Sequence, residues 1–496
     1  MIKIYNKSSR LLLMLITTVF MLSSCSTDWL DGEPKGRLTE DDLPPGSLEG
    51  LVFAAYASLR SEGTSGLPYA AIHNIRSDDA SLGGSVGDEA GAGPIFDNFQ
   101  YPKDYWLINN YWTNHYQAIA ATNRVMAAAD SIGITTDETL SLVAEAKFIR
   151  AWAYFNMVRA FGEVPKIDFR IYTQDQANVP KSSVADIYAL IDADLQAAVM
   201  NLPLKWESRY IGRLTKGAAY ALQAKTFLAR SQWGKALAAA QSVINSGQYD
   251  LSVPYDQIFT EKGENSSESV FEIQALYNQN VKDFGITWAG RQGVRGSGAM
   301  DLGWGWNVPN TRLIDAYEAN DPRKEATILF AGTTTNYRET IPTGLAREYW
   351  NKKVYTDPAI RAQTGSRFGE WFNLRIIRYA DVVLMAAEAA NETGDQQTAL
   401  NYLELVRARA RGANSAILPR VTTTNQVELR NAIRHERQVE LGMENERFFD
   451  LVRWGIDIET MHAAGKTGYQ ERNRFLPIPQ PEIDRSGGVL KQNPNY

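Results

Sequence analysis

Cysteine and histidine, which most often carry metal sites and nucleophilic chemistry, are scarce in this chain of 496 residues. It has one cysteine and four histidines. One cysteine excludes an intramolecular disulfide and a cysteine cluster around a metal. No GxSxG nucleophile elbow occurs. The histidines lack the HExxH spacing of zinc enzymes, so we expect no metal site; they are His73, His115, His435 and His462.

A surplus of basic residues is also missing, because 51 Lys and Arg stand against 57 Asp and Glu, with a net charge of -6. A nucleic acid is therefore not expected as a partner. Long apolar runs are absent outside residues 11–22, which leaves no further candidate for a membrane span. Aromatic residues, in contrast, are abundant: 12 Trp, 23 Tyr and 18 Phe. Rings outside the helical patterns suit the binding of sugars or peptides.

The first 25 residues have the parts of a secretory signal peptide. Three basic residues precede the apolar run 11–22, and the sequence LSSC ends at Cys25. The run is short for a membrane span, and LSSC looks like the lipobox at which bacterial lipoproteins are cleaved and acylated, with palmitate for example. We predict a signal peptide over 1–24 and a lipidated Cys25 with a flexible tether over 25–46, anchoring the protein without spanning the bilayer. The alternative is a secreted protein with an accidental cysteine.

From residue 47 onward most of the chain has the periodicity of paired amphipathic helices. Residues 226–246 and 388–409 read alike, as a helix, a polar turn and a second helix. This pattern resembles tetratricopeptide repeats, in which small residues let paired helices pack closely. We predict a single, mostly α domain over 47–496, with about four helix pairs, a few short strands and long irregular loop insertions. The predicted helices include 111–131, 138–161, 183–201, 214–230 and 233–246.

Two segments lack this periodicity and are our candidates for ligand-facing surface, since long loops in helical chains tend to carry function. They cover about residues 62–110 and 277–312. The first contains LGGSVGDEAGAG at 82–93, but without the strand and helix context of a phosphate or dinucleotide site. We therefore predict no cofactor. Apolar and polar residues partly alternate in SVFEIQALY at 269–277, which predicts a short strand.

The predicted ligand site is drawn from the aromatic and polar residues of these loops, with Trp371 added from the irregular chain that runs on to residue 372. For each ring, packing in the core is the competing interpretation, and we favour it for Trp304 and Trp306 in GWGWNVPN. Asp78 and Asp79 are the first suspects for the paired carboxylates of a glycoside hydrolase, although loop structure or hydrogen bonds to ligand hydroxyls explain them better. The predicted ligand-binding residues are Tyr69, His73, Asp78, Asp79, Tyr101, Trp288 and Trp371.

The stretch 433–455 reads as one helix that other units pack on. Its sequence is IRHERQVELGMENERFFDLVRWG. Wound at about 100° per residue, it places a row of charges among apolar side chains. A buried unpaired charge is costly, and the i, i+3 spacing offers Arg437 to Glu440 and Glu444 to Arg447. We predict a structural ion network here rather than a ligand site.

Several motifs, taken in this order and together with the LSSC sequence, resemble those of the SusD/RagB family of cell-surface nutrient-binding lipoproteins. The similarity covers most of the chain after Cys25. The motifs are AEAKFIRAWAYFNMVRAFGEVP at 144–165, RLTKGAAYALQAKTFLA at 213–229, IRYADVVLMAAEA at 377–389, the stretch 433–455 and the ending FLPIPQPEIDRSGGVLKQNPNY at 475–496.

The resemblance implies a protein that is anchored by lipid to the outer membrane of a Gram-negative cell and faces the exterior. Similar proteins bind oligosaccharides, or in some branches peptides, and act as a hinged lid on a SusC-like TonB-dependent transporter. They have no catalytic activity of their own. We therefore expect a non-catalytic protein that binds oligosaccharides or a polysaccharide and delivers them to such a transporter. A peptide-binding lid and a glycoside hydrolase are the alternatives.

Overall fold

The computed structural model describes residues 47–281 and 283–496. The predicted signal peptide, Cys25 and the tether lie outside the described residues. The description below concerns the compact unit Leu48–Tyr496. In the described part of the chain, no helix combines the length and the apolar character that a membrane crossing needs.

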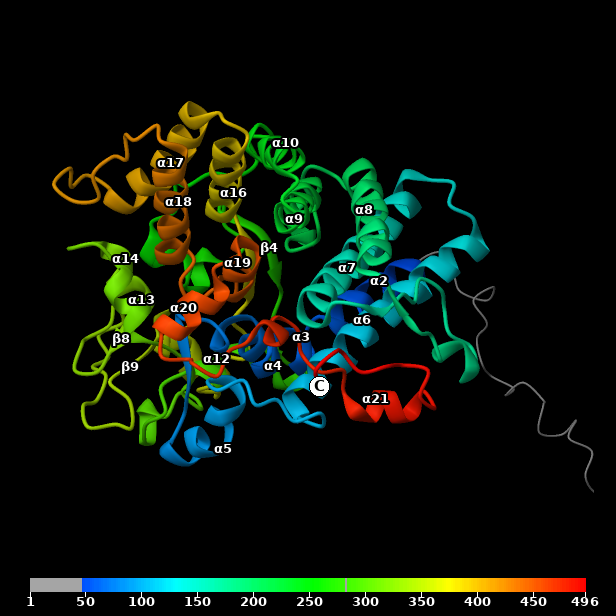
Figure 1. Ribbon diagram of the computed structural model, residues 1–496, viewed down its shortest axis with the longest axis horizontal. Coiled ribbons are helices and arrows are strands. Elements are labelled where there is room, and N and C mark those ends of the chain that lie inside the picture. Colours follow the sequence, from blue (N-terminus) through cyan, green and yellow to red (C-terminus); the bar gives the residue numbers. More distant parts are fainter. Residues whose placement is uncertain (1–46, 282) are drawn as a thin grey trace, which may run out of the picture. The chain divides into compact units, whose positions relative to one another are not determined.

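A row of eight helices forms the scaffold of this unit (Figure 1). Successive helices pack side by side, and the fifth packs on the sixth although a long segment separates them in the chain. Within the described residues they form four pairs, so the predicted tetratricopeptide-like fold is confirmed. The helices are α6 (Trp106–Ile132), α7 (Asp137–Phe161), α8 (Val184–Asn201), α9 (Lys216–Ala229), α10 (Trp233–Ile244), α16 (Tyr379–Glu392), α17 (Gln396–Arg411) and α18 (Gln426–Glu440).

Small side chains and local caps explain why these helices form and pack. Buried alanines run along α9, α10 and α16, which contact one another. Alanine favours the helix and lets two helix axes approach closely. Side-chain oxygens accept hydrogen bonds from the first turns and so fix where the helices begin; the capping residues are Thr136 for α7, Ser183 for α8, Thr215 for α9, Asp395 for α17 and Asn425 for α18.

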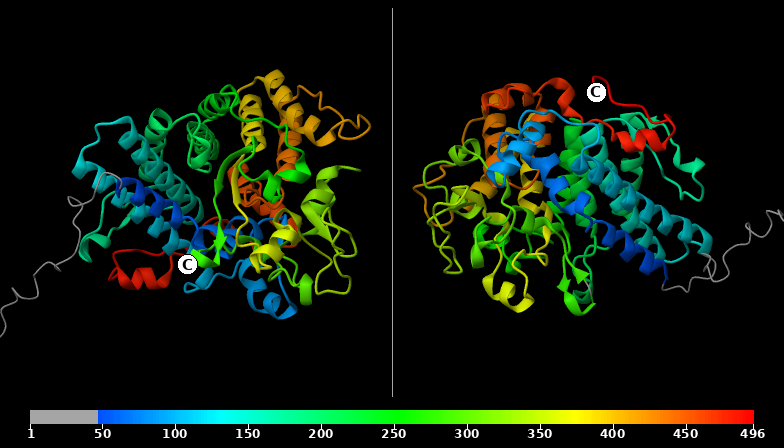
Figure 2. Two further views of the ribbon diagram at one scale, coloured as in Figure 1. Left: turned by 180° about the vertical axis from the view of Figure 1, so that it is seen from behind. Right: turned by 90° about the horizontal axis from the view of Figure 1, so that it is seen from below.

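Strands are short and occur as antiparallel pairs. The predicted strand at 269–277 is present as β4 (Ser269–Ile273), which pairs with β10 (Leu374–Arg378), and the two can be followed side by side in Figure 2. The other pairs are β1 (Ala80–Gly83) with β7 (Trp306–Pro309), β2 (Val164–Pro165) with β3 (Lys181–Ser182), β5 (Tyr277–Asn278) with β6 (Asp283–Phe284), and β8 (Ile328–Phe330) with β9 (Tyr349–Asn351).

Shorter helices fill the segments between the scaffold helices and at both ends of the unit. The first predicted loop holds three of them and a π-helical turn at Ala71–Ile75. The shorter helices of the whole unit are α2 (Ser47–Ser58), α3 (Glu62–Ser65), α4 (Leu67–Ala70), α5 (Val86–Phe96), α11 (Tyr255–Ile258), α12 (Trp288–Gln292), α13 (Thr311–Ala316), α14 (Pro322–Thr327), α15 (Pro358–Thr364), α19 (Arg447–Trp454), α20 (Asp457–Ala463) and α21 (Gln480–Arg485).

The prediction of one helix across 433–455 is wrong. Helix α18 ends at Glu440 and α19 begins at Arg447. Between them Met443 and Asn445 have φ angles of 67° and 70°, a left-handed backbone that no continuous α-helix contains. The break turns the side chains after Glu440 toward partners in other parts of the fold.

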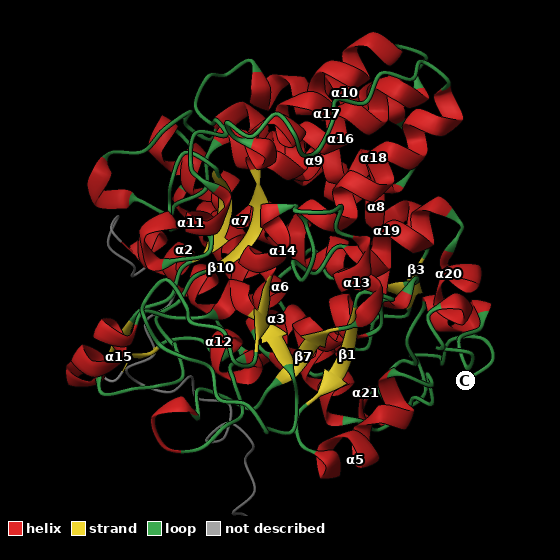
Figure 3. Ribbon diagram, turned by 90° about the vertical axis from the view of Figure 1, so that its left-hand side faces the viewer, coloured by secondary structure: helices red, strands yellow, loops and turns green. Residues whose placement is uncertain are grey.

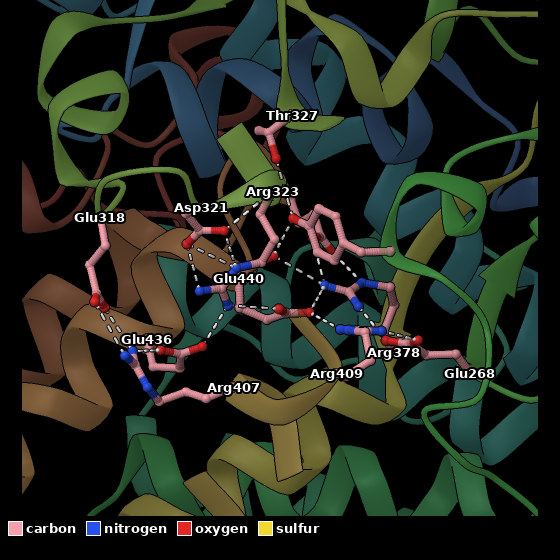
Figure 4. A network of polar contacts seen from close by, with 12 residues as sticks. Glu268, Glu318, Asp321, Arg323, Thr327, Arg378, Arg407, Arg409, Glu436 and Glu440 are labelled. Carbon is pink, nitrogen blue, oxygen red and sulfur yellow. Dashed lines mark hydrogen bonds and ion pairs between the residues drawn. The ribbon is translucent and has the colours of Figure 1, made fainter. Parts of the chain in front are cut away.

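The predicted ion network exists, but its partners come from other elements (Figure 4). The carboxylate of Glu440 accepts hydrogen bonds from Arg323, Arg378 and Arg409. The same three arginines contact further carboxylates. Burial acts to raise the pKa of the Glu440 carboxyl, but the three arginines outweigh it and hold that pKa at about 2.

The two pairings predicted within the stretch are wrong. Arg437 contacts Asp381 and Asp450 instead of Glu440. Glu444 contacts Lys353 and Arg378, and Arg447 contacts Asp78, far away in the sequence. The helix break explains the second pairing, because Glu444 and Arg447 leave the axis of α18. Arg437 and Glu440 both stay on α18, but each is paired with residues outside that helix.

Replacing Glu440 with Gln tests the importance of the network. The substitution keeps the side-chain shape but leaves three buried guanidinium groups short of one negative charge, which should lower the free energy of unfolding by about 3 kcal/mol or more. Urea unfolding at neutral pH measures this change.

Glu482→Gln is the matched control. Its carboxylate pairs with the exposed Arg485 one turn along α21, so we expect a loss below about 1 kcal/mol. Equal effects of the two substitutions would contradict the role assigned to Glu440.

Candidate functional site

The two predicted ligand-facing segments come together in space. Strand β1 of the first pairs with β7 of the second, with Ser81 opposite Val308 and Gly83 opposite Trp306. Figure 3 shows this strand pair with α5 and α12 beside it. Residues that lie more than 200 positions apart in the sequence therefore form one continuous region.

A chain of buried side-chain amides joins the two segments below this strand pair. Asn74 donates to Asn307 over 2.8 Å, and Asn307 donates to Gln292 over 2.8 Å. Asn351 donates to the same Gln292 oxygen over 2.9 Å. Buried amides that donate to one another hold a single arrangement, since breaking any of these links leaves an unpaired donor. The region thus has a rigid interior.

Charged contacts at the edge fix the same arrangement. The carboxylate of Glu62, at the start of α3, accepts hydrogen bonds from Thr287 and from Arg291. Arg60 forms an ion pair with Asp283 of β6. The beginning of the first segment is therefore attached to both ends of α12 and to the β5–β6 hairpin.

All seven predicted ligand-binding side chains lie in the interior, so the exposure expected of them is wrong. None of them is more than 8% exposed: Tyr69, His73, Asp78, Asp79, Tyr101, Trp288 and Trp371. The structure brings Tyr69, His73 and Trp288 together, but in the core rather than on a surface.

Ring packing explains the burial of the aromatic members. The ring of Tyr69 stacks on that of His73 with centroids 4.0 Å apart and meets the edge of Trp288 at 6.4 Å. The imidazole of His73 is also hydrogen-bonded to the Tyr111 hydroxyl over 2.8 Å. Burial, followed by the nearby charge of Arg159, lowers the pKa of His73 well below its usual value, so this histidine is neutral in the folded protein.

Asp78 and Asp79 are held by protein groups and do not face a groove. Both oxygens of Asp78 accept hydrogen bonds from Arg447, at 2.8 and 3.0 Å. Asp79 accepts one from Gln438 over 2.6 Å. Burial and the adjacent Asp78 carboxylate raise the pKa of Asp79 to about 7, although Arg447 opposes this. Neither carboxylate is placed to reach a glycosidic bond.

The remaining two rings also have structural partners. Tyr101 packs edge-on against Phe99, with centroids 6.1 Å apart. The indole nitrogen of Trp371 donates to Glu261 over 3.1 Å. The Tyr101 contact is local, whereas that of Trp371 joins two segments 110 positions apart.

One exposed aromatic side chain of this region is a residue that we interpreted as core. Trp304 is 48% exposed, whereas Trp306 is only half-buried and belongs to β7. The interpretation of Trp304 as a core residue is therefore wrong. Phe284 of the neighbouring hairpin is 61% exposed, and its ring meets that of Tyr277 at 6.3 Å.

Glycines on both sides explain why Trp304 points outward. A Cβ atom at Gly303 would lie 2.3 Å from the Gly290 oxygen, and Gly305 has a φ of 66°. The amide of Trp304 itself donates to the Gly290 oxygen over 2.9 Å. The backbone is thus pressed against α12, which leaves the ring no direction except solvent. A tryptophan between two glycines was the sequence signal for this.

Charged groups stand beside the exposed ring. The guanidinium carbon of Arg295 lies 5.6 Å from the Trp304 ring centroid, and Arg295 forms an ion pair with Asp88. Asp88 also accepts hydrogen bonds from the backbone and hydroxyl of Ser85 at the start of α5. Burial is the largest single effect and acts to raise the pKa of Asp88, but the hydrogen bonds from Ser85 and the charge of Arg295 together outweigh it and lower that pKa, so the carboxylate is charged at neutral pH. A flat ring, a cation and an anion therefore share one face.

Within residues 47–281 and 283–496, no group of three or more His, Cys, Asp or Glu side chains is arranged so that it could hold a metal ion. Two hollows among the described residues are large enough for a small molecule. One, of about 760 Å³, lies along α6. The other, of about 380 Å³, lies among α7, α8, α9 and α19.

Comparison with known proteins decides the family. A family model described as "SusD family" matches residues 306–496, and one described as "Starch-binding associating with outer membrane" matches residues 92–228. The chain is 28% identical to the SusD-like protein P2 of Formosa agariphila over 509 aligned positions, covering 97% of this chain and 98% of that protein.

The chain belongs to the SusD family. A solved structure described as a "Laminarin binding SusD-like protein" matches it with a TM-score of 0.76 and 27% identity, covering 91% of this chain and 99% of that one. A more distant SusD relative, the "Starch-binding protein SusD" of Bacteroides thetaiotaomicron, is 24% identical and covers 73% of the chain. The resemblance noted from the sequence motifs is confirmed. Both of these SusD relatives are described as binding proteins.

Trp288 and Trp304 should behave in opposite ways when each is replaced with alanine. In this SusD family member Trp288 fills the core beside Tyr69, so Trp288→Ala should lower the free energy of unfolding by about 3–5 kcal/mol. Trp304→Ala removes an exposed ring and should cost less than about 1 kcal/mol. Urea unfolding of both variants checks this, and equal losses would contradict the assignment of the two rings.

Asp79 should make stability depend on pH. Its pKa rises from an ordinary value of 3.8 to about 7 on folding, so the folded protein binds the proton more tightly. The free energy of unfolding should therefore fall as pH rises from about 4 to about 7, and level off above. Asp79→Asn has no carboxyl group to ionise at this position. Relative to the wild type, its free energy of unfolding should therefore increase by at least about 1 kcal/mol between pH 4 and pH 7.

Unfolding in urea at several pH values measures the difference. Asp175→Asn, at an exposed position, is the control and should follow the wild type throughout. A constant difference between Asp79→Asn and the wild type from pH 4 to 8 would show that Asp79 is already charged at low pH.

Proposed function

We propose that this protein is a cell-surface lipoprotein that binds oligosaccharides and delivers them to a SusC-like TonB-dependent transporter, with Trp304 as a ligand contact. The observation that carries the proposal is the exposed Trp304 ring on a rigid backing, where the two predicted ligand-facing segments meet.

The chemistry of this face suits a sugar. A sugar ring has an apolar face that can lie on an indole, and hydroxyl groups around its edge that need hydrogen-bond partners. Arg295 offers donors and Asp88 offers acceptors beside Trp304. Because the backbone under Trp304 is held by α12, little freedom is lost when a ligand binds.

Named relatives support a glycan as the ligand. The solved structure that is 27% identical is described as laminarin-binding, and the more distant sequence relative is described as starch-binding. Residues 92–228 match a family model whose description contains both starch binding and the outer membrane. The predicted lipidation at Cys25 would supply the membrane anchor, and the helical-repeat scaffold would offer the surface for the transporter.

A glycan array that includes laminarin tests this function. The wild type should bind at least one glycan, and Trp304→Ala should weaken that binding by at least about 1 kcal/mol, or roughly fivefold, because the stacking surface is lost. Isothermal titration calorimetry with the glycan that the array identifies gives the affinities.

Tyr172→Ala is the matched control, because Tyr172 is an even more exposed aromatic residue that lies outside both segments. It should bind as the wild type does. The absence of saturable binding to every glycan would overturn the proposed function, while unchanged affinity of Trp304→Ala would remove only the site.

A further inference from the structure

A second hollow, far from Trp304 in the sequence, combines aromatic walls with several cationic side chains. It has a volume of about 380 Å³, within the range of small-molecule sites. Two carboxylates line it, Glu446 and Asp450. Five cationic side chains line it as well: Arg159, Lys225, Arg230, Arg437 and Arg453. Phe475 and Val184, both partly exposed, also line the cavity, so it is open to solvent.

Most of these cations have close carboxylate partners. Lys225 lies 2.7 Å from Asp381 and 2.9 Å from Glu446. Arg437 lies 2.9 Å from Asp381 and 3.0 Å from Asp450. Each therefore sits between two carboxylates.

Arg453 and Arg230 are also satisfied. Arg453 contacts both Asp450 and Glu388. Arg230 forms a two-pronged ion pair with Asp192. Neither needs a ligand to balance its charge.

Arg159 differs from the other four. Its nearest carboxylate, Glu446, is 3.5 Å away and is shared with Lys225 at a shorter distance. One terminal nitrogen of Arg159 donates to Asn156 over 2.9 Å, but its Nε has no hydrogen-bond partner in the described structure. The side chain is only 10% exposed. A buried guanidinium with an unused donor is costly unless something completes it.

Aromatic rings hold this guanidinium in place. Its central carbon lies 4.0 Å from the Phe155 ring centroid and 4.3 Å from that of Phe449. Tyr188 and Phe475 are further rings of the same cavity. A guanidinium fixed between two rings keeps its donors in one direction, which favours a planar carboxylate over a spherical ion.

We propose that this cavity binds the carboxylate of a small ring-bearing molecule, with Arg159 as the anion contact and the aromatic walls around the ring. The site is separate from the proposed glycan face. Its ligand is a free organic acid or the acidic terminal unit of a larger molecule, since the carboxylate and the ring are what the cavity recognises.

Sodium benzoate is the probe, because it has one ring and one carboxylate, and benzyl alcohol is its neutral counterpart. Saturation-transfer NMR on the purified protein should show benzoate binding at least fivefold tighter than benzyl alcohol. Sodium glucuronate in a parallel titration separates the two sources of the ligand: binding tighter than benzoate indicates an acidic sugar, and weaker binding indicates an aromatic or apolar acid.

Arg159→Gln should weaken benzoate binding at least fivefold. Arg124→Gln is the control, because Arg124 is an exposed arginine of α6 that does not line this cavity. Ala229→Phe is a second test, which fills the cavity from α9 without removing any charge. It should abolish benzoate binding while the glycan affinity stays unchanged, so the two proposals fail separately.

Equal binding of benzoate and benzyl alcohol would overturn the proposal. So would unchanged benzoate binding in both Arg159→Gln and Ala229→Phe, or no benzoate binding by the wild type up to about 10 mM, a concentration at which even weak specific sites fill. Should Arg159→Gln fail to unfold cooperatively, Ala229→Phe decides alone.

Discussion

The buried carboxylate of Glu440 is the contact on which most of this structure depends. Arg323 of α14, Arg378 at the end of β10 and Arg409 of α17 all reach it. A charge that loses its partners in the interior costs several kcal/mol, so these elements cannot separate from α18 independently. The ion network therefore ties the long segment between α10 and α16 to the helical scaffold.

The interruption of the helix after Glu440 extends this constraint to the first ligand-facing segment. Because Met443 and Asn445 adopt left-handed backbone conformations, α19 leaves the axis of α18 and carries Arg447 to Asp78. The Asn445 carbonyl also contacts the ring of His73. The irregular chain before β1 is thus held from the inside by the scaffold.

The packing of the interior decides which side chains stay exposed or incompletely paired. The buried amides below β1 and β7 donate hydrogen bonds to one another, and Tyr69 and Trp288 pack against each other in the same interior. Trp304 is excluded from this interior because two glycines press its backbone against α12. In the second cavity, Arg159 keeps one nitrogen, Nε, without a hydrogen-bond partner. Exposed rings and incompletely paired charges that are held rigidly are the groups at which we expect ligands to bind.

The sequence by itself determined the helical-repeat scaffold, the two irregular segments, the presence of an ion network around residues 433–455 and the family. These follow from periodicity, small residues and motif order, which are local properties of the chain. Only the tertiary structure decided which rings are buried and which carboxylate meets which arginine. Side chains such as Asp78 and Arg447 are 369 positions apart, and a pattern read along the chain carries no information about a partner at that distance. Exposure of Trp304 likewise depends on the close approach of α12, a packing contact rather than a property of the residue itself.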